Sequence, residues 1–183
     1  MKVRKMNEND SKCMIAYFSR SGNNYVSGTI VDLPVGNTEV VAKMIQDMTE
    51  GDLFHIEAVN AYPEDYTETT EVAQQELRSN ARPKLSSHPE SLASYDVIFL
   101  GYPNWYGTMP MPVFTFLEEY NFSGKTIAPF CTHEGSGLGR SVADIKKVCP
   151  QSTVLKGLAV RGGDVKNAQN EVTAWLCELE LKK

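Results

Sequence analysis

Hydroxyl side chains and glycine are concentrated in two short stretches that could together bind a phosphate group. Ser-Arg-Ser-Gly at 19–22 follows an apolar run, and Gly-Asn-Thr at 36–38 precedes a helical pattern. The N–H groups and dipole of a helix N-terminus favour an anion, hydroxyls add donors, and glycine lets the backbone approach closely. We therefore predict a phosphate site here, with plain helix N-capping by Asn37 or Thr38 as the alternative. The candidate phosphate ligands are Ser19, Ser21, Asn37 and Thr38.

Residues 22–35 separate the two stretches. Without them the chain would read Ser-Arg-Ser-Gly-Asn-Thr, one continuous phosphate loop. The insertion contains several apolar residues, so we expect either a flap packed on the end of a sheet or a lid beside the ligand. No Walker lysine and no G-x-G-x-x-G is present, which disfavours an NTPase or a standard dinucleotide site. Arg20 either adds positive charge to the phosphate site or faces solvent.

A second loop, from Pro103 to Pro110, contains adjacent tryptophan and tyrosine residues. Because loops lie at the surface and adjacent aromatic side chains cannot easily both turn inward, we favour stacking on a flat heterocycle over core packing. The glycine that follows them would let a backbone group reach the edge of that ring system. The candidate residues in this loop are Pro103, Asn104, Trp105, Tyr106 and Gly107.

A third loop, from Thr132 to Gly139, offers backbone N–H groups, hydroxyls and a histidine–glutamate pair. A hydrolase is disfavoured because there is no G-x-S-x-G elbow, and neighbours in sequence rarely form a catalytic triad. The histidine and glutamate lack metal-ligand spacing, so we predict no metal site. The candidate residues are Thr132, His133, Glu134, Gly135 and Ser136.

Continuous apolar runs precede all three loops, at 13–18, 97–102 and 126–132. Such runs are typical of parallel strands covered on both faces. Ligands of open parallel sheets bind beyond the carboxyl ends of the strands. We therefore expect the three loops to meet around one ligand.

Helical and strand-like patterns alternate along the whole chain. We expect two further strands, one at 53–58 on a sheet edge and one at 155–160, and helices that begin near residues 37, 66, 110, 141 and 165. Five strands and five helices in strict alternation predict an α/β fold with a doubly wound, five-stranded parallel sheet.

The 183 residues suffice for one domain, which we place at 13–183 after a polar leader at 1–12 that we expect to be disordered. The net charge of −5 and the lack of a basic stripe disfavour a nucleic-acid partner. We expect no secretory signal, no membrane-spanning segment and no membrane partner. Four cysteines without paired spacing fit a reducing compartment, so we predict a cytoplasmic location.

From about Met14 to its end, the chain resembles the flavodoxins, especially a bacterial flavodoxin-like branch. The resemblance is carried by four segments: YFSRSG at 17–22, GNTEVVA at 36–42, YPNWYGTMPMP at 102–112 and THEGSG at 132–137. It implies a sheet of order 2-1-3-4-5 with helices on both faces, and non-covalently bound FMN. The hydroxyl loop would hold the phosphate, Trp105 or Tyr106 would stack on the isoalloxazine, and residues 132–136 would line its polar edge.

Two features depart from the family pattern. The phosphate loop is split, and the third loop has His133 where many flavodoxins place a tyrosine over the other face of the flavin. An open flavin face would admit a nicotinamide or a quinone.

We therefore expect an FMN-binding electron carrier that serves redox partner proteins or a small-molecule electron acceptor. The alternative is an NAD(P)H-dependent FMN oxidoreductase of the quinone reductase type, and a third hypothesis is a non-redox binding module on the same fold. In either redox role, the negative charge of Glu134 would disfavour an anionic reduced flavin and lower its potential.

Overall fold

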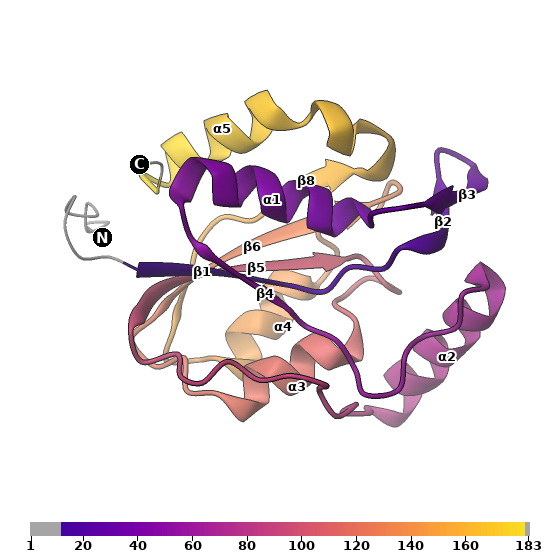
Figure 1. Cartoon of the computed structure of the whole chain (residues 1–183). Coiled ribbons are helices and arrows are strands. Elements are labelled where there is room, and N and C mark those ends of the chain that lie inside the picture. Colours follow the sequence, from indigo (N-terminus) through magenta and orange to yellow (C-terminus); the bar gives the residue numbers. More distant parts are fainter. Residues whose placement is uncertain (1–11, 182–183) are drawn as a thin grey trace.

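The computed structural model describes residues 12–181, and Figure 1 shows a central sheet between two layers of helices. The strands are β1 (Lys12–Tyr17), β2 (Gly22–Val26), β3 (Thr29–Leu33), β4 (Asp52–His55), β5 (Tyr95–Pro103), β6 (Thr126–His133), β7 (Thr153–Val154) and β8 (Leu158–Arg161). The helices are α1 (Asn37–Thr49), α2 (Tyr66–Ser79), α3 (Met111–Glu119), α4 (Ser141–Val148), the 3₁₀ helix η1 (Gly162–Asn167) and α5 (Gln169–Glu178).

The main sheet is parallel and has the order β4-β1-β5-β6-β7, with β8 also paired to β6. This confirms the expected order 2-1-3-4-5, with the fifth position divided between β7 and β8. The division falls at Gly157, where an added Cβ would lie 2.9 Å from the side chain of Leu138. The edge position expected for the strand at 53–58 is also confirmed, although β4 ends at His55.

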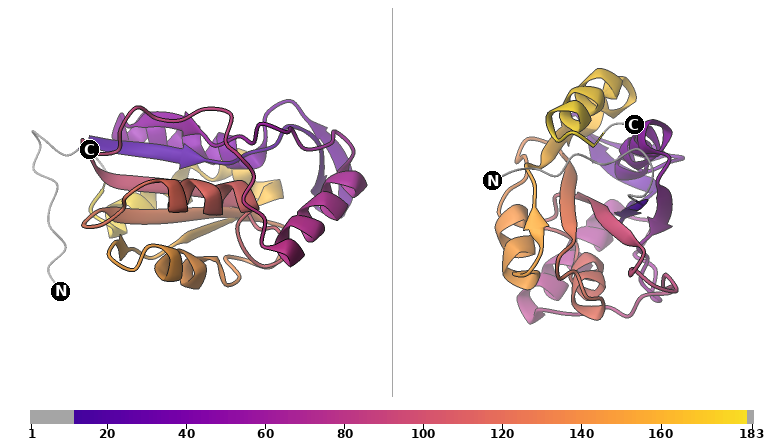
Figure 2. Two further views of the ribbon diagram at one scale, coloured as in Figure 1. Left: turned by 90° about the horizontal axis from the view of Figure 1, so that it is seen from below. Right: turned by 90° about the vertical axis from the view of Figure 1, so that its left-hand side faces the viewer.

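Alternate residues of β1 enter two separate hydrophobic cores, because successive side chains of a strand point to opposite faces. Met14 and Ala16 pack in the core that also contains residues of α3 and α4. Ile15 and Tyr17 pack in the core on the other face, with residues of α1 and α5. The helices therefore cover both faces, as Figures 1 and 2 show, and this buries the continuous apolar runs of the sequence.

The insertion at 22–35 forms a two-stranded antiparallel hairpin that the strict alternation did not include. Gly22 lies opposite Leu33, and the strands turn at Ser27 and Gly28, whose φ angles are 51° and 90°. Positive φ at both central residues matches the right-handed twist of hairpin strands. The hairpin lies near α2 at the carboxyl end of the main sheet (Figure 1).

Other boundaries also differ from those expected. The predicted N-cap at Asn37 or Thr38 is wrong, because both residues lie inside α1 and Gly36 is the N-cap residue. The last helical region begins with η1 rather than with a single α-helix. Of the leader predicted at 1–12, Lys12 is instead the first residue of β1, and residues 1–11 lie outside the described part of the chain. Within residues 12–181, no helix has the length and apolar character needed to cross a membrane.

Candidate cofactor-binding site

A hollow at the carboxyl ends of β1, β5 and β6 brings all three predicted loops together. The predicted residues that line it are Ser19, Arg20, Asn37, Thr38, Pro103, Asn104, Trp105, Thr132, His133, Glu134 and Ser136. The remaining candidates, Ser21, Tyr106, Gly107 and Gly135, are not among the lining residues. Three further residues line the hollow and were not predicted from the sequence: Asn24, Tyr25 and Tyr66.

The two halves of the split loop are in direct contact. A Cβ at Gly36 would lie 2.6 Å from the carbonyl oxygen of Arg20 and would overlap Ser19 Oγ, so only glycine fits without a shift. Ser19 Oγ also accepts the backbone N–H of Glu39 at 3.1 Å, in the first turn of α1. The hairpin thus begins and ends at nearly the same place, so that Gly36 lies beside Ser19 and Arg20 as it would in a loop without the insertion.

The end of the hollow at the start of α1 has backbone and hydroxyl donors. The first N–H groups of α1, those of Asn37 and Thr38, have no acceptor within the helix and can bind an anion. The buried hydroxyls of Thr38 and Thr132 lie 2.8 Å apart. Since one hydroxyl donates to the other, the second proton of the pair is left for a ligand.

Arg20 lines the hollow, but its guanidinium group is occupied by backbone carbonyls. It donates to Pro63 O at 2.7 Å, to Glu64 O at 2.6 Å and to Asn23 O. Burial lowers the pKa of Arg20 from its ordinary value. Arg20 therefore joins the start of the hairpin to the segment before α2, and its hydrogen bonds are not directed at an anion.

Trp105 is the aromatic side chain of the second loop that borders the hollow. Its ring lies nearly perpendicular to the rings of Phe18 and Tyr62, with centroid separations of 5.2 and 5.1 Å and interplanar angles of 79° and 82°. The Tyr62 hydroxyl is fixed in turn by donation to Glu76 Oε2 at 2.6 Å. These contacts hold the indole in one orientation at the edge of the hollow.

Tyr106 and Gly107 form a tight turn, with φ angles of 53° and 85°. The Tyr106 hydroxyl donates to Thr70 O at 2.9 Å, and its side chain is 44% exposed. The N–H of Gly107 donates to Asn104 Oδ1, and its carbonyl accepts the N–H of Arg140 at 2.8 Å. Of the two adjacent aromatic residues, Trp105 is therefore the one that borders the hollow.

His133 is held as one neutral tautomer. Its Nδ1 accepts the backbone N–H of Gly135 at 2.9 Å, so the neutral ring carries its proton on Nε2. Burial, and then the nearby positive charge of Arg161, lower the pKa of His133. Near neutral pH the ring is an uncharged hydrogen-bond donor in the lining of the hollow.

Glu134 connects the third loop to the hairpin. Its Oε2 accepts the backbone N–H of Ser27 at 2.9 Å, at the hairpin turn. A Cβ at Gly162 would overlap Glu134 Oε1 and would lie 2.7 Å from Asn37 Nδ2, so the carboxylate also packs against the start of η1. The negative charge of this carboxylate is consequently fixed at the hollow.

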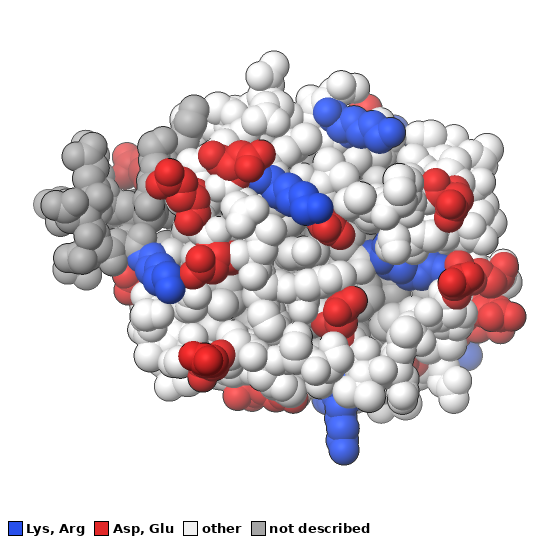
Figure 3. All heavy atoms as spheres, viewed as in Figure 1, with Lys and Arg blue, Asp and Glu red and all other residues white. Residues whose placement is uncertain are grey.

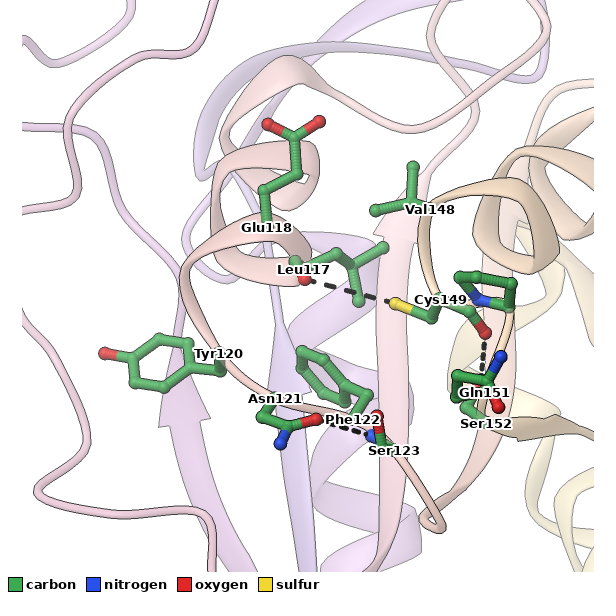
Figure 4. A pocket seen from close by; sticks show the side chains of 11 residues that line it. Leu117, Glu118, Tyr120, Asn121, Phe122, Ser123, Val148, Cys149, Gln151 and Ser152 are labelled. Carbon is green, nitrogen blue, oxygen red and sulfur yellow. Dashed lines mark hydrogen bonds between the residues drawn. The ribbon is translucent and has the colours of Figure 1, made fainter.

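A second hollow lies at the opposite end of the strands (Figure 4). It is formed by the ends of α3 and α4 and the loops that follow them, and Figure 4 shows Leu117, Tyr120, Phe122 and Cys149 among its side chains. Ligands of open α/β sheets bind at the carboxyl ends of strands rather than at this edge. We assign no ligand to it.

Charged side chains of both signs are dispersed over the face drawn in Figure 3. Acidic side chains gather at its right-hand end, where the hairpin and α2 lie in Figure 1. Exposed acidic residues in these two elements include Asp32 and Glu68. This distribution agrees with the net charge of −5.

Comparison with known proteins gives the family. The Flavodoxin family matches residues 12–179 of the chain. The chain belongs to the flavodoxin family. No curated protein matches it significantly.

Solved structures share the fold of this flavodoxin-family chain. A protein of Bacteroides eggerthii assigned as a flavoprotein is 28% identical, with a TM-score of 0.76 over 94% of this chain and 100% of that one. A second one, from Bacteroides uniformis, is 26% identical, with a TM-score of 0.68 over 90% and 99%. A Lactobacillus acidophilus flavoprotein, solved in complex with FMN, is 21% identical, with a TM-score of 0.63 over 87% and 99%.

Proposed function

We propose that this flavodoxin-family chain binds FMN in the hollow at the carboxyl ends of β1, β5 and β6 and carries electrons between redox partners. The main support is that a helix N-terminus, an oriented indole and a polar loop border the same hollow. These three features match the phosphate, the isoalloxazine and the polar ring edge of one molecule. The cofactor is FMN.

Each group of residues has a distinct role in this proposal. Ser19, Asn37 and Thr38 bind the phosphate through hydroxyl and backbone donors. Trp105 stacks on the isoalloxazine, and His133 donates from Nε2 toward its polar edge. When bound, FMN supplies the electron-transfer chemistry, while the protein orients it and sets its potential.

An assay of nicotinamide oxidation distinguishes an electron carrier from an NAD(P)H-dependent oxidoreductase. The purified holoprotein is mixed anaerobically with NADPH, or with NADH, and a quinone, and nicotinamide absorbance is followed. A carrier leaves the nicotinamide unoxidised but accepts electrons once a partner reductase is added. Rapid nicotinamide oxidation without a reductase would contradict the carrier role and support the enzyme. A chain that takes up no FMN would instead support a non-redox binding module.

A further inference from the structure

The hollow has a second group of aromatic rings, which comes from the hairpin inserted in the first loop and from α2. Tyr25 of β2 and Tyr66, the first residue of α2, line the same hollow as Trp105. The third loop, at 132–139, contains no phenylalanine, tyrosine or tryptophan. We propose that Tyr25 and Tyr66 contact the bound isoalloxazine as a second aromatic wall of the site. This inference rests on the proposed FMN function.

The two tyrosine rings lie against each other in a near-parallel arrangement. Their centroids are 6.0 Å apart and their planes differ by 28°. Tyr25 is 41% exposed, and Tyr66 is partly buried. A stacked pair that borders a hollow offers a flat apolar surface, and a flat heterocycle gains most from such a surface.

The turn of the hairpin is fixed to the far side of the hollow. The Ser27 N–H donates to Glu134 Oε2 at 2.9 Å. A Cβ at Gly163 would lie 2.5 Å from Ser27 Oγ, so the turn also packs closely on η1. The turn of the hairpin is therefore anchored both to the third loop and to η1.

The start of the hairpin is fixed to the segment that leads into α2. Arg20 donates both to Asn23 O, in β2, and to the carbonyls of Pro63 and Glu64, just before α2. Figure 1 shows the hairpin and α2 at the same end of the molecule. Anchors at both ends hold Tyr25 against Tyr66 before any ligand binds, which reduces the ordering cost of binding.

The test uses apoprotein titrated with FMN and, separately, with riboflavin, with binding followed by flavin fluorescence. Tyr25→Ala and Tyr66→Ala remove a ring each, whereas Tyr25→Phe and Tyr66→Phe keep it. Tyr25→Leu removes the ring but keeps an apolar side chain on β2. Ile30→Ala is the matched control, because Ile30 lies opposite Tyr25 in the hairpin, is 53% exposed and does not line the hollow. Thermal unfolding of each apoprotein confirms that it is folded.

We expect each ring-removing variant to bind FMN roughly three- to tenfold more weakly, as the loss of one aromatic contact implies. The same loss should appear with riboflavin, which lacks the phosphate, while the phenylalanine variants and Ile30→Ala stay near the wild type. Unchanged FMN affinity in the ring-removing variants, or an equal loss in Ile30→Ala, would overturn this inference and leave the FMN function intact. A wild-type chain that binds no FMN would overturn the proposed function itself.

Discussion

The hydroxyls of Thr38 and Thr132 join the first and third loops, although ninety-four positions separate the two residues in the chain. Both side chains are buried, at 2% and 4% exposure, so each hydroxyl depends on the other for a hydrogen bond. Replacing one of them leaves a buried polar group without its partner, whereas replacing both with groups of similar shape can be nearly neutral. Comparing single with double replacement therefore distinguishes the effect of the pair on stability from its effect on FMN binding.

We expect Thr132→Val to lower the unfolding free energy of the apoprotein by about 1–3 kcal/mol. The double variant Thr38→Val/Thr132→Val should be less destabilised than the sum of the single changes, yet should still bind FMN more weakly than the wild type. Urea unfolding and FMN titration measure the two effects. Thr115→Val is the control, since this buried threonine of α3 does not line the hollow and should leave FMN affinity unchanged. Additive stability losses would contradict the pairing.

Glu134 can be tested for charge separately from contact, because glutamine keeps an oxygen that accepts the Ser27 N–H. We expect Glu134→Gln to raise the potential for full reduction of bound FMN by tens of millivolts, since a negative charge near the reduced, anionic flavin is removed. Potentiometric titration followed by absorbance measures it. Glu90→Gln, exposed in the loop before the amino end of β5, should leave the potential unchanged. Equal potentials in Glu134→Gln and the wild type would remove this role.

His133 should make stability depend on pH. Its pKa in the folded state is lowered by burial, so the unfolded chain binds the proton more readily. The contribution to stability is complete above the unfolded pKa of about 6.5 and is lost as pH falls through the folded value. Between pH 7.5 and 5.5, urea unfolding of the apoprotein should therefore show a larger loss of stability in the wild type than in His133→Asn. An equal loss in both proteins would contradict this assignment.

At the scale of elements, the two halves of the split loop meet at Gly36, the residue before α1, which lies against Ser19 and Arg20. Gly36→Ala places a Cβ against Ser19 Oγ and 2.6 Å from Arg20 O. Because the φ of Gly36 is −64°, the cost is one of space rather than of backbone conformation. We expect a loss of about 1–3 kcal/mol in apoprotein stability and weaker FMN binding, measured by urea unfolding and titration. The control is Val35→Ala, because Val35 is the neighbouring residue and is 37% exposed, so neither stability nor FMN affinity should change. A Gly36→Ala protein with the stability and FMN affinity of the wild type would show that the contact is not required.

The hairpin could have been predicted from the sequence, but the assumption that strands and helices strictly alternate left it out. Ser27-Gly28 lies between short runs with apolar residues, and such a dipeptide supplies the two positive φ angles of a tight turn. By contrast, the sequence could not predict which of Trp105 and Tyr106 borders the hollow. Adjacent rings point apart, and which one enters the hollow depends on a positive φ at Tyr106 and on contacts with Phe18 and Tyr62, which come from other segments.

At the scale of the molecule, the parallel sheet and the meeting of the three loops could be predicted. Parallel strands that are buried on both faces have continuous apolar runs. The runs before residues 19, 103 and 132 therefore predict three such strands, each followed by one of the loops. Tyr66 could not be assigned to the site, because α2 follows the edge strand β4 and its place at the hollow depends on contacts with segments distant in the sequence, such as Tyr25 and Tyr106. The local sequence pattern thus predicts the sheet and its covering helices, whereas contacts between distant segments decide which residues border the hollow.

The central claim, that this chain holds FMN non-covalently, is tested most directly by the visible absorbance spectrum of the purified protein, with added FMN and after heat release. We predict flavin absorbance bands that stay with the folded protein at about one FMN per chain and enter solution when the protein is denatured. A colourless protein that remains colourless after incubation with FMN and gel filtration would contradict the claim.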